Sequence, residues 1–441
     1  MTNMRKIYIL FAVAAVLAVA GCQKPVAGNE DNQEIPGYDE KNDPNRPSGN
    51  DDVTVSPEEY IKETAKALMD ELNYNKWSAE AEFIHKVIVA LQNKHIDDEK
   101  LEKWVEALED SWSLEPRKEG NNTIYDNYIR LSDAKGHFEE QPDGTFTQTE
   151  ANDFQIIFLI DGEKVSATFA CTDSKVPVRI SSRMYNNYDY ETQQEYYEYW
   201  NTYIYVPESA SAKILRGTSE FATLDLRMSA DVKDPQQVNP YTDSASLEAT
   251  FKIGVYTLSL QKVEYSPTGA SAKIKLLSGS SSLITVEAKA GYELDPASTS
   301  NYPIPIKGGN INASVDVMGR IQLKADIPDV KKFLDAGLAS NDKQQDANAF
   351  KALVAQLDES FTAAMYFNGS SNPRATLGVE PAIAEGSQHW YINPVIKFSD
   401  GTSYGIEEYF SEERFGDLIS YANSWLEGIK NYVSTLFRDV Q

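Results

Sequence analysis

The glutamates near residue 410 are the residues whose type and spacing come closest to a catalytic pair. Glu407, Glu408, Glu412 and Glu413 lie close together in the chain, and glycosidases need two carboxyl groups across the bond that they cleave. Ser411, however, stands where a helix N-cap would stand. Acids that follow such a cap stabilise the first helical turn through the helix dipole. The pattern favours a helix start, and we predict no catalytic residue.

Histidine and cysteine give no stronger chemical signal. Glu82 and His85 have the Glu-x-x-His spacing of di-iron bundles, but the second pair that such a site needs is missing. Paired ligands with zinc spacing are also missing. Cys171 falls on the apolar face of a predicted strand, where a thiol is a small hydrophobic side chain. We predict no metal site and no cofactor, and hydrolysis by scattered carboxylates stays open only as a third alternative.

Tyrosine is concentrated in one stretch, MYNNYDYETQQEYYEYWNTYIYVP, which runs from residue 184 to residue 207. Its first half is polar and predicts a loop or a short helical turn. In its second half, strand alternation places Tyr197, Tyr199 and Tyr203 on one face and Trp200 and Ile204 on the other. Aromatic faces stack on sugars and on peptide side chains. We therefore predict that Tyr197, Tyr199 and Tyr203 bind a glycan or peptide, with nearby tyrosines extending the surface.

A structural role is the alternative for the same tyrosines. Aromatic side chains are frequent in strands, where they pair across neighbouring strands without any ligand. The chain would then be a structural or assembly component of the outer membrane. The two hypotheses differ in what a tyrosine substitution changes, either an interaction or the stability of the fold.

The N-terminus carries the most specific motif. Arg5 and Lys6 precede an apolar run that ends in Ala20-Gly21-Cys22, and this run is too short for a membrane-spanning helix. The motif resembles the bacterial lipoprotein signal, which implies removal of residues 1–21 and lipidation of Cys22. Such lipids anchor a protein stably to a membrane.

The residues after Cys22 extend this resemblance. Residues 22–55 are rich in acids and poor in apolar periodicity, which predicts a disordered tether. Cys22-Gln23-Lys24 and the acidic run resemble the surface-export signals of Bacteroidota-type lipoproteins. The resemblance implies an outer-membrane protein, lipid-anchored and exposed at the cell surface, and it implies no particular binding or catalytic residue.

Net charge and cysteine content limit the other partners. The formal charge is −26, which argues against binding to nucleic acid. With Cys22 lipidated, only Cys171 remains, so no disulfide framework is possible. The sequence leaves the oligomeric state open.

The remaining patterns predict an α+β fold in three parts. Residues 56–116 carry helical periodicity and predict a bundle of three helices, the third opening at Asp97. Residues 120–328 alternate with period two and predict an antiparallel β domain. Residues 329–441 predict an α+β domain, packed on the β domain, that ends in a long amphipathic helix.

Two local patterns refine the β domain. Asp161-Gly162 lies between two apolar runs and predicts a hairpin with a two-residue turn. The segment Tyr205–Ile214, YVPESASAKI, recurs 60 residues later as Tyr265–Ile274, YSPTGASAKI, with seven of ten positions identical. This repeat predicts a duplicated hairpin unit.

Overall fold

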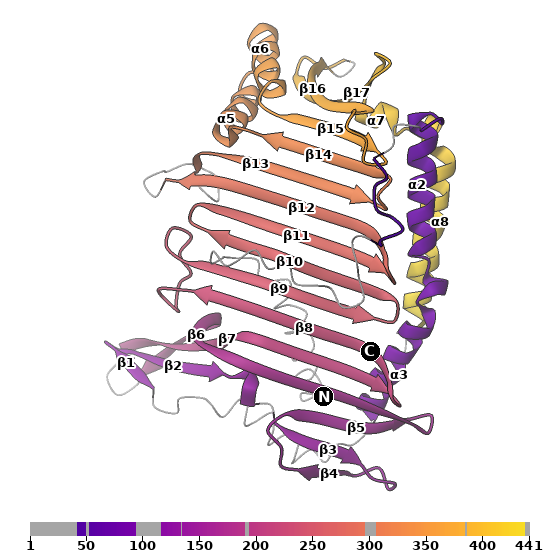
Figure 1. Cartoon of the computed structure of the whole chain (residues 1–441). Helices are drawn as coiled ribbons and strands as arrows, with labels where there is room; N and C mark the ends of the chain where they lie inside the picture. Colours follow the sequence, from indigo (N-terminus) through magenta and orange to yellow (C-terminus); the bar gives the residue numbers. More distant parts are fainter. Residues whose placement is uncertain are drawn as a thin grey trace.

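One large sheet dominates the chain. The computed structural model describes residues 42–49, 53–93, 116–133, 135–189, 194–295, 306–383 and 386–436. It shows a mixed sheet of 18 strands and, among these residues, six α-helices, with 52% strand and 24% helix. The α+β class that we predicted is therefore wrong, because the fold is mostly β (Figure 1).

The elements follow in chain order. The helices are α2 (Pro57–Glu71), α3 (Ser78–Asn93), α5 (Val330–Asn341), α6 (Ala347–Asp358), α7 (Ile406–Tyr409) and α8 (Glu412–Leu436), with 3-10 turns at Tyr74–Lys76 and Leu131–Asp133. The first nine strands are β1 (Arg117–Glu119), β2 (Asn122–Ile129), β3 (Gly136–Glu140), β4 (Phe146–Thr149), β5 (Phe154–Ile160), β6 (Glu163–Asp189), β7 (Gln194–Arg216), β8 (Ser219–Asp231) and β9 (Ser244–Ile253). The others are β10 (Tyr256–Ser266), β11 (Gly269–Ser278), β12 (Ser281–Leu294), β13 (Ile306–Val317), β14 (Ile321–Ile327), β15 (Thr362–Phe367), β16 (Ala375–Ile383), β17 (Trp390–Phe398) and β18 (Ser403–Gly405).

The sheet is a long antiparallel meander with two parallel additions. From β5 to β18, each strand pairs antiparallel with the next one in the chain. Strand β3 pairs parallel with β5, and β2 pairs parallel with the first half of β7. Short turns between successive strands make this neighbour-to-neighbour order the simplest antiparallel topology.

The two faces of the sheet differ in chemistry because successive side chains of a strand point to opposite faces. One row of paired residues across β8 to β15 is Leu224, Phe251, Leu258, Leu276, Ile284, Val317, Ile321 and Phe367. The adjacent row on the other face is Asp225, Thr250, Ser259, Lys275, Thr285, Asp316, Gln322 and Tyr366. The sheet therefore has one apolar face and one polar face.

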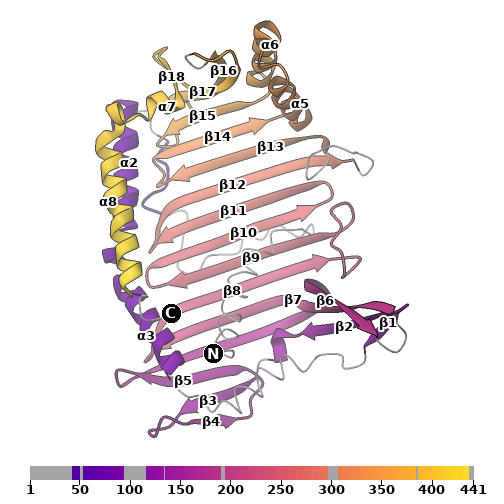
Figure 2. The same cartoon turned by 180° about the vertical axis from the view of Figure 1, so that it is seen from behind.

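The N-terminal helices pack on this sheet and not in a bundle of their own. Helix α2 places Tyr60 on Phe367, with ring centroids 4.5 Å apart, and α3 places Phe83 on Phe221, at 4.4 Å. The predicted three-helix bundle at 56–116 is wrong, because α2 packs with α8 at the strand ends (Figure 2) and buries Tyr60 among residues of the sheet and of α8. The third predicted helix lies outside the described residues.

The sheet continues through the predicted boundary at residue 328. Strand β15 pairs with β14, and α5 and α6 are inserted in the connection between them. The predicted long C-terminal helix is confirmed as α8, which runs beside α2 along the strand ends (Figure 2). Its Phe415 is buried in one cluster with Tyr60 and Phe367.

The end of the predicted tether is docked on the sheet. Asp43 is only 7% exposed, and both of its carboxylate oxygens accept the Ser282 amide at 3.1 Å. Asn45 donates from Nδ2 to the Ser282 carbonyl at 2.9 Å. Gly319, at φ +65°, leaves room for the Asn45 carbonyl where a Cβ would clash. The rest of the tether up to residue 41, and Cys22 with it, lies outside the described residues.

Of the two local patterns, the turn is confirmed and the duplication is not. Asp161 and Gly162 have φ of 51° and 80°, as a tight turn between β5 and β6 requires. Tyr205–Ile214, however, lies within a single strand, β7, whereas Tyr265–Ile274 turns at Pro267-Thr268 between β10 and β11. The two segments share a sequence pattern and not a supersecondary unit.

Candidate functional site

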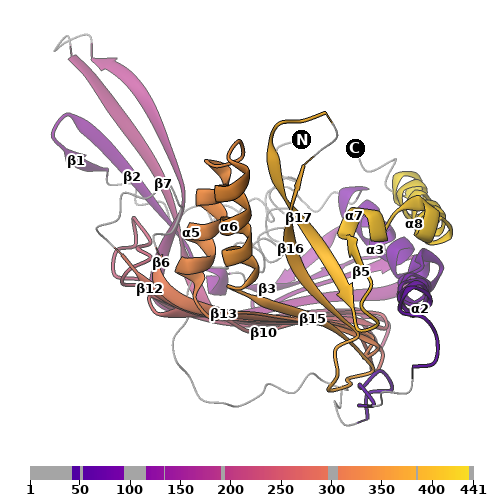
Figure 3. The same ribbon diagram turned by 90° about the horizontal axis from the view of Figure 1, so that it is seen from above.

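The tyrosine-rich stretch forms part of a projecting ribbon, which we call the arm and define as residues 117–129, 177–189 and 194–205. In Figure 3, β1, β2 and the adjoining parts of β6 and β7 rise away from the plane of the main sheet, on the same side as α5, α6 and α8. The loop or short helical turn predicted for the first half of the stretch is wrong at residues 184–189, which belong to β6, and at Gln194 and Glu195, which belong to β7; residues 190–193 lie outside the described residues.

The arm begins where the pairing of β6 with β7 is irregular. Register shifts occur between Thr172 and Asp173, between Asp173 and Pro177, and between Arg179 and Ser181. Such bulges increase the local twist of a strand and bend it. On the other side of β7, the partner changes at the same place, from β8 at Ser209–Arg216 to β2 at Glu198–Ile204. The ribbon therefore separates from the main sheet near Tyr205.

The base of the arm is held by stacked tyrosines. Tyr203 is 2% exposed, and its ring stacks on that of Tyr128 at 4.8 Å. The guanidinium of Arg130 lies 3.6 Å from the ring centroid of Tyr205. Burial raises the pKa of both Tyr203 and Tyr128 above the ordinary value of 10.0. Tyr203 therefore has little surface left for a ligand, although we predicted it as a binding residue.

A chain of polar side chains crosses the three strands of the arm. Ser182 Oγ donates to Asn201 Oδ1 at 2.8 Å, and Asn201 Nδ2 donates to Asp126 Oδ1 at 2.9 Å. Arg117 lies 3.6 Å from Asp126. Asn201 is 5% exposed, so these hydrogen bonds are largely shielded from water. They hold β6, β7 and β2 in register.

Beyond these bonds, aromatic and apolar side chains appear on both faces. Tyr197 and Tyr199 are half-buried, with rings 6.5 Å apart, and Met184 is paired with Tyr199 and 59% exposed. On the opposite face, Trp200 stacks on Tyr125 at 4.2 Å with an interplanar angle of 20°. Tyr185 and Tyr188 are both close to half exposed. Two of the three predicted residues, Tyr197 and Tyr199, therefore lie together near the tip.

The pair formed by Tyr125 and Trp200 was not predicted from the sequence. Alternation places Trp200 on the face opposite the three tyrosines, but alternation alone does not show which face is covered. Tyr125 reaches Trp200 only because β2 pairs parallel with β7, with the two residues in register. Parallel pairing between distant strands leaves no local pattern in the sequence.

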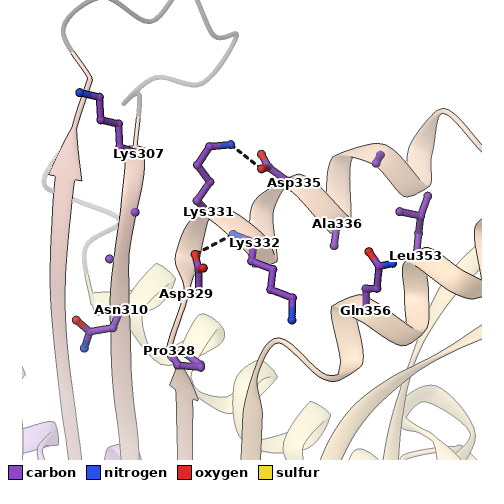
Figure 4. A pocket seen from close by; sticks show the side chains of 13 residues that line it. Lys307, Asn310, Pro328, Asp329, Lys331, Lys332, Asp335, Ala336, Leu353 and Gln356 are labelled. Carbon is purple, nitrogen blue, oxygen red and sulfur yellow. Dashed lines mark hydrogen bonds and ion pairs between the residues drawn. The ribbon is translucent and has the colours of Figure 1, made fainter.

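A second surface feature is a cleft of about 780 Å³ between the start of β13 and helices α5 and α6 (Figure 4). Three lysines line it: Lys307, Lys331 and Lys332. Lys331 is paired with Asp335 at 2.5 Å. Figure 4 shows Lys307 pointing away from the helices and Lys332 extending between them. Because these cations diverge, the cleft presents no convergent set of charges, and the arm is the stronger candidate.

The other residues singled out by their chemistry lie apart from the arm's tip. Glu412 and Glu413 lie in the first turn of α8, as predicted. Cys171 is half-buried, and burial together with the nearby Asp173 carboxylate raises its pKa to about 12. A thiol with that pKa is protonated at neutral pH and is a poor nucleophile. Glu82 and His85 lie on α3.

Comparison with known proteins gives the chain no family. No protein-family model, no curated protein and no solved structure matches it. In the part of the chain that the structure describes, no helix has both the length and the apolar composition needed to cross a bilayer.

Proposed function

We propose that this chain is a lipid-anchored, exported protein of the outer membrane that binds a glycan or peptide at the cell surface through the arm. The signal that ends at Cys22 supports the anchor. The observation that carries the binding role is the group of large side chains exposed on the arm, namely Met184, Tyr185 and Tyr188, at 59%, 47% and 46%. Clustered apolar side chains at a protein surface mark interaction sites.

The geometry of the tip suits ligands with flat or apolar parts. A tyrosine ring gives contact area at a small cost in side-chain entropy and carries a hydroxyl that can hydrogen-bond. The arm offers such rings on both faces, with Tyr197 and Tyr199 on one and Tyr185 on the other. A sugar ring or an apolar peptide side chain can stack on either face.

The structural alternative is favoured by one observation at the base of the arm. Tyr203 and Tyr128 are stacked on each other, and Tyr203 is buried. We therefore assign an architectural role to these two rings and the binding role to the tip.

The binding role is tested on arrays of glycans and linear peptides with a chain that carries Cys22→Ser. The arm variant combines Tyr185→Ser with Tyr199→Ser. Its matched control is Leu159→Ser, because Leu159 is 47% exposed on β5, away from the arm. Removal of aromatic anchors costs about 2 kcal/mol or more in a typical interface. We expect the arm variant to lose signal at least tenfold while the control keeps it, and equal signals from both variants would contradict the proposal.

The anchor is tested separately in cells. Cys22→Ser is expected to abolish the incorporation of labelled palmitate and to release the protein from the membrane fraction, because the lipids would be its attachment. A Cys171→Ser variant is the control and should remain labelled. Labelling of the Cys22→Ser variant would refute lipidation at this position.

A further inference from the structure

From Ser181 to Asn187, the outer edge of β6 has no strand partner among the described residues. Strand β5 covers β6 only at Glu163–Phe169, whereas β7 covers its other edge as far as Asp189. Beyond the last bulge, the pairing of Ser181–Asp189 with β7 is regular. A regular strand edge presents unpaired N–H and C=O groups and is a template for another strand.

The outward-facing main-chain groups can be assigned from one hydrogen bond. The Arg179 amide donates to the Pro235 carbonyl at 3.1 Å and not to β7, so Arg179 faces outward. The register shift between Arg179 and Ser181 inserts one residue, and outward residues then alternate along the strand. Beyond the bulge, they are Ser182, Met184 and Asn186.

The side chains along this edge suit an added strand. Met184 lies on the same face as Tyr199, its partner on β7, whereas Tyr185 lies on the other face. Ile180, in the last bulge, is 52% exposed. Apolar side chains of an added strand, alternating between the two faces, would meet Met184 and Tyr188 on one side and Tyr185 on the other.

From Lys175 to Met184, β6 carries cations and no acid, unlike the chain as a whole. Lys175, Arg179 and Arg183 lie along β6 and are exposed, in a chain with a formal charge of −26. Within the residues that the structure describes, none of the three belongs to an ion pair. Natural strand edges use such cations to discourage pairing with one another, and the same cations attract acidic partners.

We propose that the edge of β6 between Ser181 and Asn187 binds an extended, acidic polypeptide segment as an additional strand. This inference rests on the proposed function and assigns the ligand class as peptide and not glycan. Only a polypeptide repeats N–H and C=O groups at the spacing of the edge, and strand addition of this kind supplies affinity through the main chain. Contacts of alternate peptide side chains with Met184 and Tyr185 supply specificity.

The test selects linear 12-residue peptides from a phage-displayed library on the chain that carries Cys22→Ser. The selected peptide is then titrated against two variants at one position. Met184→Pro removes one outward amide and keeps the inward amides that pair with β7. Edge strands tolerate proline at such an outward position. Met184→Thr removes the same side chain but keeps the amide. Met184→Thr therefore reports the contribution of the side chain alone, and we expect Met184→Pro to bind the peptide at least tenfold more weakly than Met184→Thr does.

The peptide provides a second, independent readout. Two versions of the peptide are made, each methylated at the backbone nitrogen of every second residue, so that together they cover all positions. We expect one version to lose binding and the other to bind within threefold of the unmethylated peptide. This result does not depend on the folding of Met184→Pro. Equal binding of the two versions, equal binding to both variants, or no enriched peptide would overturn the inference.

Two further outcomes separate this inference from the proposed function. If glycans bind the arm in a Tyr185-dependent manner and no peptide does, the proposed function stands and strand addition fails. If light scattering shows a dimer that Met184→Pro dissociates, the edge pairs with a second copy of this chain, which overturns the assignment to a partner peptide. If the variant with both Tyr185→Ser and Tyr199→Ser keeps every interaction of the unsubstituted arm, the proposed function itself is wrong.

Discussion

The segments Tyr205–Ile214 and Tyr265–Ile274 share seven of ten residues and have different structures. In both, alternation places the last Ala and Ile on the apolar face of the sheet. The first segment lies within a single strand, β7, and the second contains a hairpin turn. The shared residues therefore determine which face each side chain occupies and not the path of the chain.

The path differs because of two adjacent positions. Gly269 of the second segment corresponds to Ser209 of the first, and Thr268 corresponds to Glu208. A Cβ at Gly269 would lie 2.6 Å from the Ala290 carbonyl of β12, so this turn approaches the next strand too closely for a side chain. Ser209 is paired with Thr172 on one side and with Arg227 on the other, so the strand continues through this position. Only the first segment is continuous with an arm.

The largest expected loss of stability comes from Tyr203, which lies two positions before the first segment. Tyr203→Ala removes a buried ring stacked on Tyr128 and is expected to lower the free energy of unfolding by about 3 kcal/mol. The equivalent change before the second segment, Val263→Ala, removes a smaller, half-buried side chain and should cost less. Urea denaturation measures both. A smaller loss for Tyr203→Ala would mean that the base of the arm is not architectural.

Exchanging Gly269 and Ser209, which differ between the two segments, is expected to lower the stability by an intermediate amount. Gly269→Ser forces a side chain against the Ala290 carbonyl and is expected to cost about 1–3 kcal/mol. The reverse change, Ser209→Gly, adds only backbone entropy in a strand and should cost about 0.5–1 kcal/mol. Urea midpoints of the two variants test the order. Equal losses would show that Gly269 does not decide where the chain turns.

The smallest effect concerns the first tyrosine of the second segment. The Tyr265 hydroxyl donates to the Pro240 carbonyl at 2.9 Å, and burial raises its pKa above 10.0. A raised pKa in the folded state means that the protonated hydroxyl stabilises the fold, fully below pH 10 and less as the pH rises through the folded pKa. Tyr265→Phe should cost about 1 kcal/mol at pH 7.

Melting temperatures measured from pH 8 to 11.5 test this account of Tyr265. The wild type should lose stability above pH 10, and the difference between it and Tyr265→Phe should shrink there. Tyr185→Phe, which changes an exposed ring in the arm, is the control and should leave the profile unchanged. A constant difference between the wild type and Tyr265→Phe across this range would contradict the role of the hydroxyl.

Local features of the fold could be predicted from the sequence. Alternation placed Tyr197 and Tyr199 on one face, Asp161-Gly162 gave a tight turn, and the apolar stripe beginning at Phe415 gave a long helix. Each of these features depends on residues that are neighbours in the chain, because the periodicity of a strand or a helix is visible in a short stretch of sequence.

Long-range arrangement could not be predicted in the same way. The helical patterns after Ser56 predicted a bundle because amphipathic helices need an apolar partner, and nothing local shows that this partner is the sheet, as for Tyr60 on Phe367. Burial of Tyr203 depends on β2, which pairs from a distant part of the chain. Exposure of the tip likewise depends on which segments cover the arm.

The most direct test of the binding role is a hydrogen-exchange footprint of the chain with a glycan or peptide taken from the arrays. The proposal predicts slower amide exchange in residues 177–188 and 195–205 on addition of that ligand, with residues 306–310 and 328–336 around the cleft unchanged. Protection at the cleft, or no protection in the arm at a saturating concentration of ligand, would contradict the assignment of binding to the arm.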